Sequence, residues 1–588
     1  MSVVSSVCCY CGTGCGVLIE TAEGKITAVR GDPAHPANRG RLCTKGSTLA
    51  LAAEVGGRAL VPEFRSERHT PRTPVTWDTA LEAAAERFAA IIRAHGPDAV
   101  GFYISGQLLT EDYYVFNKLA KGLIGTNNID TNSRLCMSSA VAGYKATLGA
   151  DAPPGCYEDV DHAGVIFISG SNTAFAHPIL FRRIEAARAA NPDMKLIVVD
   201  PRRTDTADAA DLHLAILPGT DVALYHAMLN VMLWEELIDR DYIAAHTTGW
   251  EKLRETVRDY TPEKMAPVCG VAAADIVQAA RWFAAGPTLS LYCQGLNQSS
   301  CGTDKNASLI NLHLATAQIG KPGAAPLSLT GQPNAMGGRE VGGMAHLLSA
   351  HRELANPAHR AEVARLWGVD AVPDQPGKTA VEMFDAVSNG EIRALWIACT
   401  NPAQSLPNQT LVREALAKAE FVVLQEAFAD TETAPYADLL LPAATWGECE
   451  GTLTNSERYI SHVRAAIPPP GQARPDCDVV VEFAWRLGEK LGRDGKKLFP
   501  YTCAEEVFNE HRETTRGRDL DITGLSYAML DRAPQQWPLP EGAASGKARL
   551  YEDGIFPTAS GRAQFHNAPY RPVAEPIDAR YPLHLNTG

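Results

Sequence analysis

The chain has 588 residues, too many for one hydrophobic core, so we expect two to four domains. Its formal net charge of −14, with no basic block, argues against a nucleic-acid partner. No apolar run approaches the roughly 20 residues that cross a bilayer, so no membrane association is expected. Residues 1–7 show neither a charged signal region nor a twin-arginine pair, which predicts a cytoplasmic protein. The 14 cysteines should then be free thiols or metal ligands.

The stretch "VCCYCGTGCG" near the N-terminus has the spacing of a metal-binding motif. Cys8, Cys11 and Cys15 are spaced C-x2-C-x3-C, and Cys43 follows 27 residues later. A tight turn with several cysteines and a distant fourth ligand favours a [4Fe–4S] cluster. A zinc site of four cysteines is the alternative, although such sites more often use two C-x2-C pairs. Cys9 fits the spacing less well and is interpreted as a bystander.

Three short apolar runs between residues 165 and 217 predict buried strands that alternate with helices. Such a pattern indicates parallel strands joined by right-handed crossovers, with ligands at the carboxyl ends of the strands. The polar residues at those ends suit phosphate, ribose and a base edge. These candidate ligands are Gly170, Ser171, Asn172, Asp200, Arg202, Thr204, Gly219 and Asp221.

A second series of apolar runs has a similar rhythm between residues 394 and 442. It contributes the candidate ligands Asn401, Gln425 and Asp430. We favour the interpretation that the same nucleotide-binding arrangement occurs twice in the chain. The alternative is that any doubly wound sheet produces apolar runs with this spacing. Neither half contains G-x-G-x-x-G, so an ordinary NAD site is not supported.

Two further segments carry unusual residues. In "NSRLCMSS", Cys136 follows an arginine-containing turn and precedes a helical pattern, a position that favours a thiolate; the alternative is a buried, inert cysteine. The segment 330–343, "TGQPNAMGGREVGG", surrounds Asn334 and Arg339 with five glycines. So many glycines indicate either backbone that runs close to a ligand or a mobile surface loop.

Together these motifs resemble the molybdopterin oxidoreductase family. The cysteine spacing, "NSRLCMSS", "VDPRRT", "PGTD", "TGQPNAMGGREVGG" and "TNSERYIS" all match, and within the family they look most like bacterial assimilatory nitrate reductases. The resemblance implies a multidomain α/β fold: a [4Fe–4S] domain and two related doubly wound parallel-sheet domains, with the final β domain largely absent from this chain. The expected divisions are 1–60 for the cluster, 61–130 plus 325–470 for one dinucleotide, 131–324 for the other, and 471–588 as a connecting region.

The resemblance also implies roles for individual residues. The [4Fe–4S] cluster would be held by Cys8, Cys11, Cys15 and Cys43, and Lys45 would lie between the cluster and a pterin. Without the resemblance, Lys45 would be interpreted as a solvated surface charge. Cys136 would bind molybdenum, which two molybdopterin guanine dinucleotides also hold. Met137 and Arg339 would line the substrate funnel, since a guanidinium fork matches a planar anion such as nitrate. Each of the two sets of strand-end residues named above would bind one of the two dinucleotides. Asn334 would contact the cofactor.

The implied activity is two-electron reduction of nitrate to nitrite by oxygen-atom transfer, with the cofactor supplying the chemistry. Formate dehydrogenase is the nearest alternative, but its metal-binding residue is typically followed by histidine, where this chain has Met137. His177 would support the formate alternative only if its side chain reached the metal. A non-catalytic electron-transfer relative is a second alternative. Electrons would come from a ferredoxin, a flavodoxin or a separate NAD(P)H flavoprotein. Residues 581–588 are expected to begin a further β domain.

Overall fold

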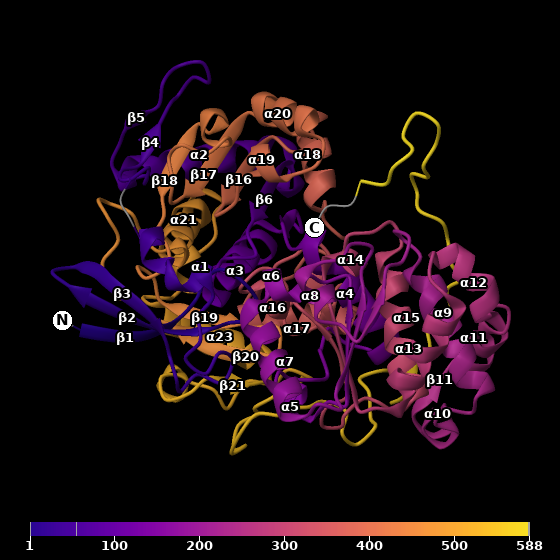
Figure 1. The fold of residues 1–588 in the computed structure, drawn as a ribbon. Coiled ribbons are helices and arrows are strands. Elements are labelled where there is room, and N and C mark those ends of the chain that lie inside the picture. Colours follow the sequence, from indigo (N-terminus) through magenta and orange to yellow (C-terminus); the bar gives the residue numbers. More distant parts are fainter. Residues whose placement is uncertain (1, 54–55, 586–588) are drawn as a thin grey trace. The chain divides into compact units, whose positions relative to one another are not determined.

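The computed structural model describes residues 2–53 and 56–585, which form two compact units (Figure 1). Unit 1 comprises residues 1–134, 332–455 and 459–546; unit 2 comprises residues 135–331, 456–458 and 547–588. The predicted connecting region 471–588 is therefore divided: its first part belongs to unit 1, and the part from Lys547 onward belongs to unit 2.

A small antiparallel sheet opens unit 1. It contains β1 (Ser2–Val7), β2 (Gly16–Ala22) and β3 (Lys25–Gly31) in that order. Val7 pairs with Gly16, so the cysteine-bearing loop 8–15 is closed at its base by the first rung of the sheet. The short helix α1 (Thr44–Ser47) starts directly after Cys43. This arrangement places the first three cysteines of the motif on one hairpin loop.

The main sheet of unit 1 has the strand order β5-β4-β18-β17-β16-β6-β7. Its members are β5 (Thr73–Pro74), β4 (Glu63–Phe64), β18 (Leu439–Pro442), β17 (Phe421–Glu426), β16 (Ala394–Ala398), β6 (Val100–Ile104) and β7 (Ile129–Thr131). The strands from β18 to β7 run parallel, which confirms the predicted second series as β16, β17 and β18. Phe88 of α2 (Trp77–His95), Trp396 and Phe483 of α21 (Asp476–Lys490) interlock in its core.

The other elements of unit 1 surround this sheet. They are η1 (Leu49–Ala53), η2 (Pro97–Ala99), α3 (Thr110–Asn117), η3 (Lys118–Ile124), α16 (Ala335–Glu340), β14 (Leu347–Leu348), β15 (Arg352–Glu353), α17 (Pro357–Trp367), α18 (Ala380–Ser388), α19 (Pro402–Ser405), α20 (Gln409–Lys418), η4 (Ala434–Tyr436), β19 (Gly451–Thr454), β20 (Tyr459–Val463), α22 (Gly495–Leu498), α23 (Ala504–Thr514), α24 (Tyr527–Leu530) and β21 (Gln535–Gln536).

Unit 2 is built on a five-stranded parallel sheet with the order β10-β9-β8-β12-β13. The strands are β10 (Leu212–Leu214), β9 (Lys195–Val199), β8 (Val165–Ser169), β12 (Thr288–Tyr292) and β13 (Ala325–Ser328). The three predicted strands are therefore confirmed as parallel neighbours. Strand order reverses beside β8, and such a switch point opens a crevice at the carboxyl ends of an α/β sheet.

Helices cover both faces of this sheet. They include α7 (Pro178–Ala190), α9 (Asp221–Trp234), α13 (Ala273–Ala285) and α15 (Gly302–Ala315). The remaining elements are α4 (Arg134–Leu148), α5 (Asp159–His162), α6 (Thr173–Ala176), α8 (Asp205–Asp208), α10 (Arg240–His246), β11 (Thr247–Thr248), α11 (Trp250–Val257), α12 (Pro262–Cys269), α14 (Gln294–Asn297) and β22 (Ala563–Gln564). No single helix among the described residues has the length and apolarity to cross a membrane. The helices α12 and α13, which meet at a bend of 109°, have that length and apolarity only when taken together.

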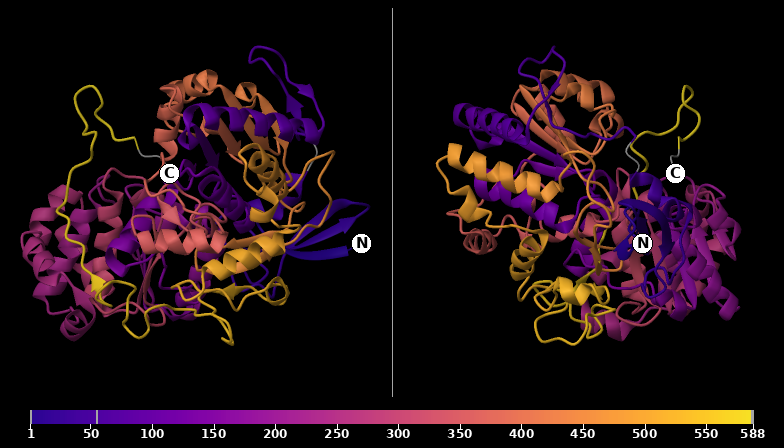
Figure 2. Two further views of the ribbon diagram at one scale, coloured as in Figure 1. Left: turned by 180° about the vertical axis from the view of Figure 1, so that it is seen from behind. Right: turned by 90° about the vertical axis from the view of Figure 1, so that its left-hand side faces the viewer.

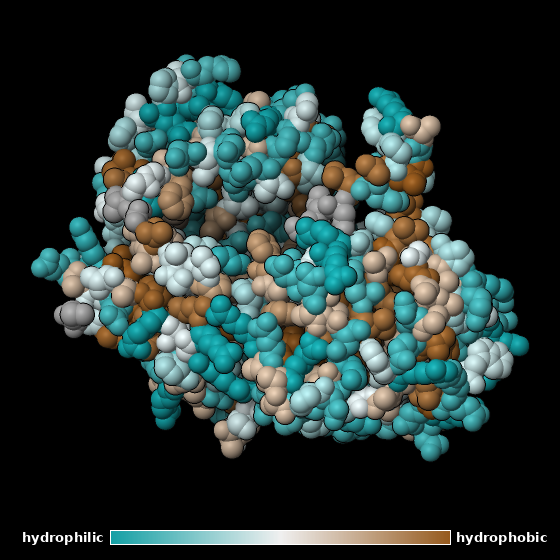
Figure 3. Space-filling view, in the orientation of Figure 1, coloured by the Kyte–Doolittle hydropathy of each residue, from teal (hydrophilic) through white to brown (hydrophobic). Residues whose placement is uncertain are grey.

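Residues 565–585, the described part of unit 2 after β22, contain no helix or strand and appear as a yellow loop (Figure 2). The strand expected at 581–588 is not formed over residues 581–585, and residues 586–588 lie outside the described part. The Asp578 carboxylate accepts hydrogen bonds from the backbone N–H groups of Arg580 and Tyr581, a local turn that competes with extended pairing. Apolar side chains of this segment are exposed, Leu583 by 84% and Leu585 by 92%. The face of the molecule seen in Figure 3 carries both hydrophilic and hydrophobic residues.

Candidate functional site

The four cysteines of the predicted cluster gather around the loop between β1 and β2. The backbone N–H of Cys8 donates to the carbonyl of Cys15 over 2.9 Å, which holds the two ends of the loop together. Cys8 and Cys15 are buried, whereas Cys11 and Cys43 are partly exposed. Burial raises the pKa of the Cys15 thiol well above its usual value, and the neighbouring Cys11, Cys8 and Cys43 raise it further. Lys45 acts in the opposite sense on the same thiol, so it lies near the group.

This donor set fits an iron–sulfur cluster. Buried thiols crowded together resist ionisation unless a positive centre binds their sulfurs, which is what cluster irons do. Among the described residues, no group of three or more His, Cys, Asp or Glu side chains is arranged about a single ion. Burial also raises the pKa of the Cys9 thiol, to about 12.

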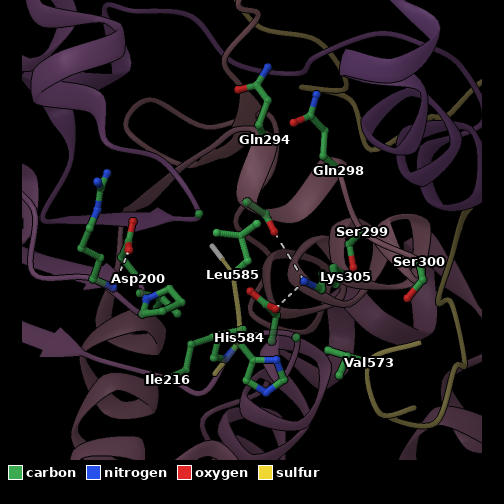
Figure 4. A pocket seen from close by; sticks show the side chains of 18 of the residues that line it. Asp200, Ile216, Gln294, Gln298, Ser299, Ser300, Lys305, Val573, His584 and Leu585 are labelled. Atoms are coloured by element: carbon green, nitrogen blue, oxygen red, sulfur yellow. Dashed lines mark hydrogen bonds and ion pairs between the residues drawn. The ribbon is translucent and has the colours of Figure 1, made fainter. Parts of the chain in front are cut away.

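A pocket of about 1540 Å³ lies in unit 2 at the carboxyl ends of β8, β9 and β12 (Figure 4). It stands where the sequence predicts the first dinucleotide. Of the eight predicted ligands, the pocket is lined by Gly170, Ser171, Asn172, Asp200, Arg202, Gly219 and Asp221. Thr204 does not line it: its side chain caps α8 by accepting the Ala207 backbone N–H over 3.2 Å.

The polar groups of the pocket are held in place by hydrogen bonds. The Asn172 side-chain oxygen accepts from the Thr206 hydroxyl over 2.8 Å. The Asp200 carboxylate accepts the Arg202 backbone N–H over 2.8 Å, and burial raises its pKa. These residues present an amide, a carboxylate and a guanidinium, a mixture suited to a base edge and to phosphate groups.

Glycines allow the backbone to form the wall of this pocket. Gly170 has φ of +56° and accepts a hydrogen bond from the Gly295 N–H over 3.0 Å. A Cβ added at Gly295 would lie 2.5 Å from the Gly170 Cα, so the ends of β8 and β12 approach too closely for side chains. Exposed backbone groups at this edge match what a pyrophosphate requires. Pocket shape and donors together fit a pterin dinucleotide.

Cys136 lies in the first turn of α4, as the sequence predicts. It is partly exposed, and its sulfur accepts a hydrogen bond from the Gln294 side-chain amide over 2.9 Å. The helix dipole at this position favours a thiolate, the form that binds a metal. Met137 is buried, and the Asn297 amide nitrogen lies 3.5 Å from its sulfur. Met137 therefore packs within unit 2.

Sequence reasoning missed several polar residues of the pocket, among them Gln294 and Lys305. Lys305 is buried, and its ammonium lies 2.8 Å from the Asp221 carboxylate and 3.4 Å from the Gly295 carbonyl. Figure 4 labels Lys305 and marks interactions of its ammonium with dashed lines. Gln294 follows the strand-like run "TLSLYC", so the rule used for β8 and β9 would have marked it. Residues 573–578 of the C-terminal segment also line the pocket.

The three predicted ligands of the second dinucleotide lie in unit 1 at the ends of β16 and β17. Asn401 accepts from the Thr433 hydroxyl over 2.7 Å, and Asp430 is exposed. Gln425 is fully buried: its oxygen accepts from the Trp396 indole over 3.1 Å, and its nitrogen donates to the Asp476 carboxylate over 2.5 Å. The Gln425 amide thus supports the strand end from inside the unit.

Asn334 and Arg339 belong to unit 1, around α16, and both are buried. The Asn334 oxygen accepts the Thr454 N–H over 2.7 Å and its nitrogen donates to the Leu108 carbonyl over 2.9 Å, so this side chain anchors the loop. Arg339 donates to the Ala335 carbonyl over 3.0 Å. The glycine-rich segment is thus an ordered, buried turn and helix, which decides against a mobile surface loop.

His177 behaves as a core histidine of unit 2. It is buried, and its Nε2 lies 2.9 Å from the Thr330 carbonyl oxygen. This contact occupies one ring nitrogen inside the unit.

Several known proteins are similar to this chain in sequence or in fold. A nitrate reductase of Synechocystis sp. is 44% identical over 99% of this chain and 83% of its own length; one of Klebsiella oxytoca is 45% identical over 100% and 66%. Other relatives are a periplasmic nitrate reductase of Desulfovibrio desulfuricans (42%), an F420-dependent formate dehydrogenase subunit alpha of Methanocaldococcus jannaschii (37%) and an assimilatory nitrate reductase catalytic subunit of Bacillus subtilis (36%). In fold, acetylene hydratase from Pelobacter acetylenicus is similar with a TM-score of 0.74 and 23% identity, over 95% of this chain and 77% of that one.

Two family models cover most of the sequence. The model of the molybdopterin oxidoreductase Fe4S4 domain matches residues 1–52, and that of molybdopterin oxidoreductase matches residues 72–486. The protein is accordingly an oxidoreductase that uses a [4Fe–4S] cluster and a molybdenum–molybdopterin cofactor. The chain belongs to the molybdopterin oxidoreductase family.

Proposed function

We propose that the chain reduces nitrate to nitrite, with Cys136 as the protein ligand of molybdenum. The observation that carries the proposal is the placement of this sulfur: it sits in the first turn of α4 and bonds to Gln294, a lining residue of the dinucleotide pocket. The assignment of nitrate as substrate is supported by the relatives at 44% and 45% identity, which carry that activity in their names. Met137, rather than a histidine, follows the cysteine.

When bound, the molybdenum cofactor supplies two-electron oxygen-atom transfer, and the chain binds, orients and insulates. Asn172, Asp200 and Asp221 would hold the guanine dinucleotide in unit 2, with Lys305 neutralising the buried acid. In unit 1, Asn401 and Asp430 would contact the second dinucleotide. The four cysteines of the N-terminal loop would hold the cluster, and Lys45 would lie on the electron path to the pterin.

The substrate-binding role falls to Arg339. A guanidinium presents a rigid planar fork of donors, which matches the flat, delocalised nitrate anion better than a point charge does. Burial of Arg339 supports this role because a desolvated cation attracts an anion more strongly. The positive charge of Arg339 would also favour binding of the nitrate anion over binding of neutral molecules.

We also propose that the reaction serves nitrate assimilation in the cytoplasm, with a ferredoxin, flavodoxin or NAD(P)H flavoprotein as electron donor. The Bacillus relative, which is named an assimilatory catalytic subunit, supports this proposal. The Desulfovibrio relative, which is named a periplasmic nitrate reductase, supports the alternative of a periplasmic enzyme. Growth of a strain that lacks the gene for this protein distinguishes the two alternatives. Loss of growth on nitrate as the sole nitrogen source supports assimilation, whereas loss of nitrate respiration alone overturns it.

Formate oxidation is the second candidate because one relative is a formate dehydrogenase subunit. Metal analysis and turnover on anaerobically purified protein distinguish the candidates. About four irons and one molybdenum per chain, with nitrite formed from nitrate and a reduced viologen, are the expected result. Formate oxidation without nitrate reduction would overturn the substrate assignment. Iron without molybdenum would instead identify a non-catalytic electron-transfer relative.

A further inference from the structure

Gln294 joins two sulfurs in unit 2. It is the first residue of α14, directly after β12, and its amide nitrogen donates to the Cys136 sulfur over 2.9 Å. The Cys293 thiol donates to the oxygen of the same amide, and that sulfur also lies 3.0 Å from the Leu329 carbonyl oxygen. The result is a chain of contacts from the core of the sheet through one amide to the proposed metal ligand.

The chemistry of the two ends determines how the amide must point. A thiolate only accepts hydrogen bonds, whereas a thiol can donate one. The amide therefore turns its N–H₂ toward Cys136 and its oxygen toward the Cys293 thiol. A flipped amide would set its oxygen against the Cys136 sulfur, two acceptors in contact. Cys293, which is buried, thus fixes the orientation of Gln294 from behind.

The opposite side of this contact is kept open by Gly331. A Cβ at that position would lie 3.3 Å from the Gln294 amide nitrogen and 3.9 Å from the Cys136 sulfur. A larger residue would therefore press on the amide at the point where it meets the sulfur. The hydrogen bond depends on a small residue beside it as well as on Cys293 behind it.

We propose that Gln294 is a positioning residue that orients the Cys136 sulfur and tunes its electron donation to the molybdenum; this inference rests on the proposed ligand role of Cys136. A donor to a metal-bound sulfur draws electron density from it and makes reduction of the metal easier. Gln294 also lines the dinucleotide pocket, so the same side chain contacts both the thiolate and the cofactor cavity.

The test is a redox titration of the holoenzyme followed by molybdenum electron paramagnetic resonance, on the wild type and Q294M. Methionine keeps the length of the side chain but cannot donate. We expect the Mo(V)/Mo(IV) equilibrium to shift toward the oxidised form by about threefold, which is about 28 mV for a one-electron couple. Resonance Raman spectra should show a changed molybdenum–cysteine sulfur stretch, with the iron content and the cluster signal unaltered.

Gln298 provides the matched control because it is a glutamine of the same pocket whose amide donates to the Leu135 carbonyl, over 2.8 Å, rather than to a sulfur (Figure 4). Q298M should leave the potential and the sulfur stretch as in the wild type. Should Q294M fail to retain molybdenum, C293A replaces it: Gln294 remains, its orientation is released, and a smaller shift in the same direction is expected.

Three results would overturn the inference. The first is a wild-type potential and sulfur stretch in both Q294M and C293A, and the second is an equal shift in Q298M. The third is a wild-type holoenzyme whose X-ray absorption shows no sulfur ligand on molybdenum beyond those of the pterins. That third result refutes the ligand role of Cys136 itself, whereas the first two leave it standing.

Discussion

Lys305 and Asp221 form a buried ion pair at the dinucleotide pocket: the ammonium lies 2.8 Å from the carboxylate, and the two side chains are 4% and 7% exposed. Asp221 also begins α9, where the helix dipole favours a negative charge. The pair keeps an otherwise uncompensated acid in position beside the cavity. The Lys305 ammonium thereby fixes the position of the Asp221 carboxylate, whose oxygens accept hydrogen bonds from a base edge.

K305M should therefore destabilise the protein and weaken retention of the dinucleotide. Removing one partner of a buried pair typically costs about 3–5 kcal/mol because the other charge stays buried. We expect a lower thermal unfolding midpoint and less guanine nucleotide released per chain on acid hydrolysis. K378M is the control, since Lys378 pairs with Glu391 at an exposed site where such pairs contribute about 0–1 kcal/mol. Equal effects of the two substitutions would contradict the role of Lys305.

G295A tests the close approach of β8 and β12. The new Cβ would lie 2.5 Å from the Gly170 Cα and 2.9 Å from its carbonyl oxygen, and backbone atoms cannot turn away as a flexible side chain can. Overpacking of this kind costs about 1–3 kcal/mol, and the pocket wall should shift with it. Nucleotide content and the unfolding midpoint should both fall. In G56A the added methyl group meets open space, and a loss as large as that of G295A would refute the steric argument.

Much of the unit 2 site was predictable from sequence because buried parallel strands leave a simple signature. Apolar runs followed by Gly, Asn, Asp or Arg marked the ends of β8 and β9, and those ends meet at one edge by topology. Lys305 was not predictable in this way. It reaches the pocket from α15, far along the chain from Asp221, and only the folded sheet brings the two together.

Gln425 shows a different limit of sequence reasoning. Successive side chains of a strand point to opposite faces, and one residue decides between the ligand side and the core. The structure turns Gln425 inward to Trp396 and Asp476, while the following Glu426 is partly exposed. Thr204 is similar: a threonine before a short helix suits a cap as well as a ligand, and it caps α8.

C136S tests the proposed metal ligand. Serine keeps the size of the side chain but replaces the thiolate with a hydroxyl, a far weaker ligand for a soft metal centre. Nitrate reduction with a viologen donor should be lost, while the absorbance and iron content of the cluster remain, since Cys136 is not among the four cysteines of the N-terminal loop. Full activity in C136S would refute the assignment. C156S, at a buried cysteine beside Asp159, is the matched control.

R339K tests the proposed anion site. Lysine retains the charge but offers one ammonium in place of the planar fork, so nitrate should lose at least one charge-assisted hydrogen bond. Such a bond contributes about 1.5–3 kcal/mol, which corresponds to a fall in kcat/KM for nitrate of about tenfold to a hundredfold. R516K, at an exposed arginine paired with Glu513, should leave the kinetics unchanged. Unchanged kinetics in R339K would remove Arg339 from the site.

His313 should make stability depend on pH in a defined direction. Its ring is buried in unit 2 between the Ser290 hydroxyl at 2.7 Å and the Gln318 carbonyl at 3.1 Å. Burial lowers the pKa of His313 from 6.5 to about 3, partly offset by the hydrogen bond to Gln318. The unfolded chain therefore takes up a proton first as the pH falls below 6.5. The stabilisation is complete above that pH and is lost as the pH falls from 6.5 toward 3.

Comparison of the wild type with H313Q isolates this effect because the other titrating groups are common to both proteins. The wild type should be more stable at pH 7, and its advantage should shrink by about 1.4 kcal/mol for each pH unit below 6.5. Thermal unfolding midpoints at pH 7, 6 and 5 measure it, with H313N as a second variant if H313Q does not fold. Midpoints that fall in parallel would show that the folded ring takes up its proton at the same pH as in the unfolded chain, and would contradict the prediction. The neutral ring satisfies both contacts, because Nδ1 can donate to the Gln318 carbonyl while Nε2 accepts from the Ser290 hydroxyl.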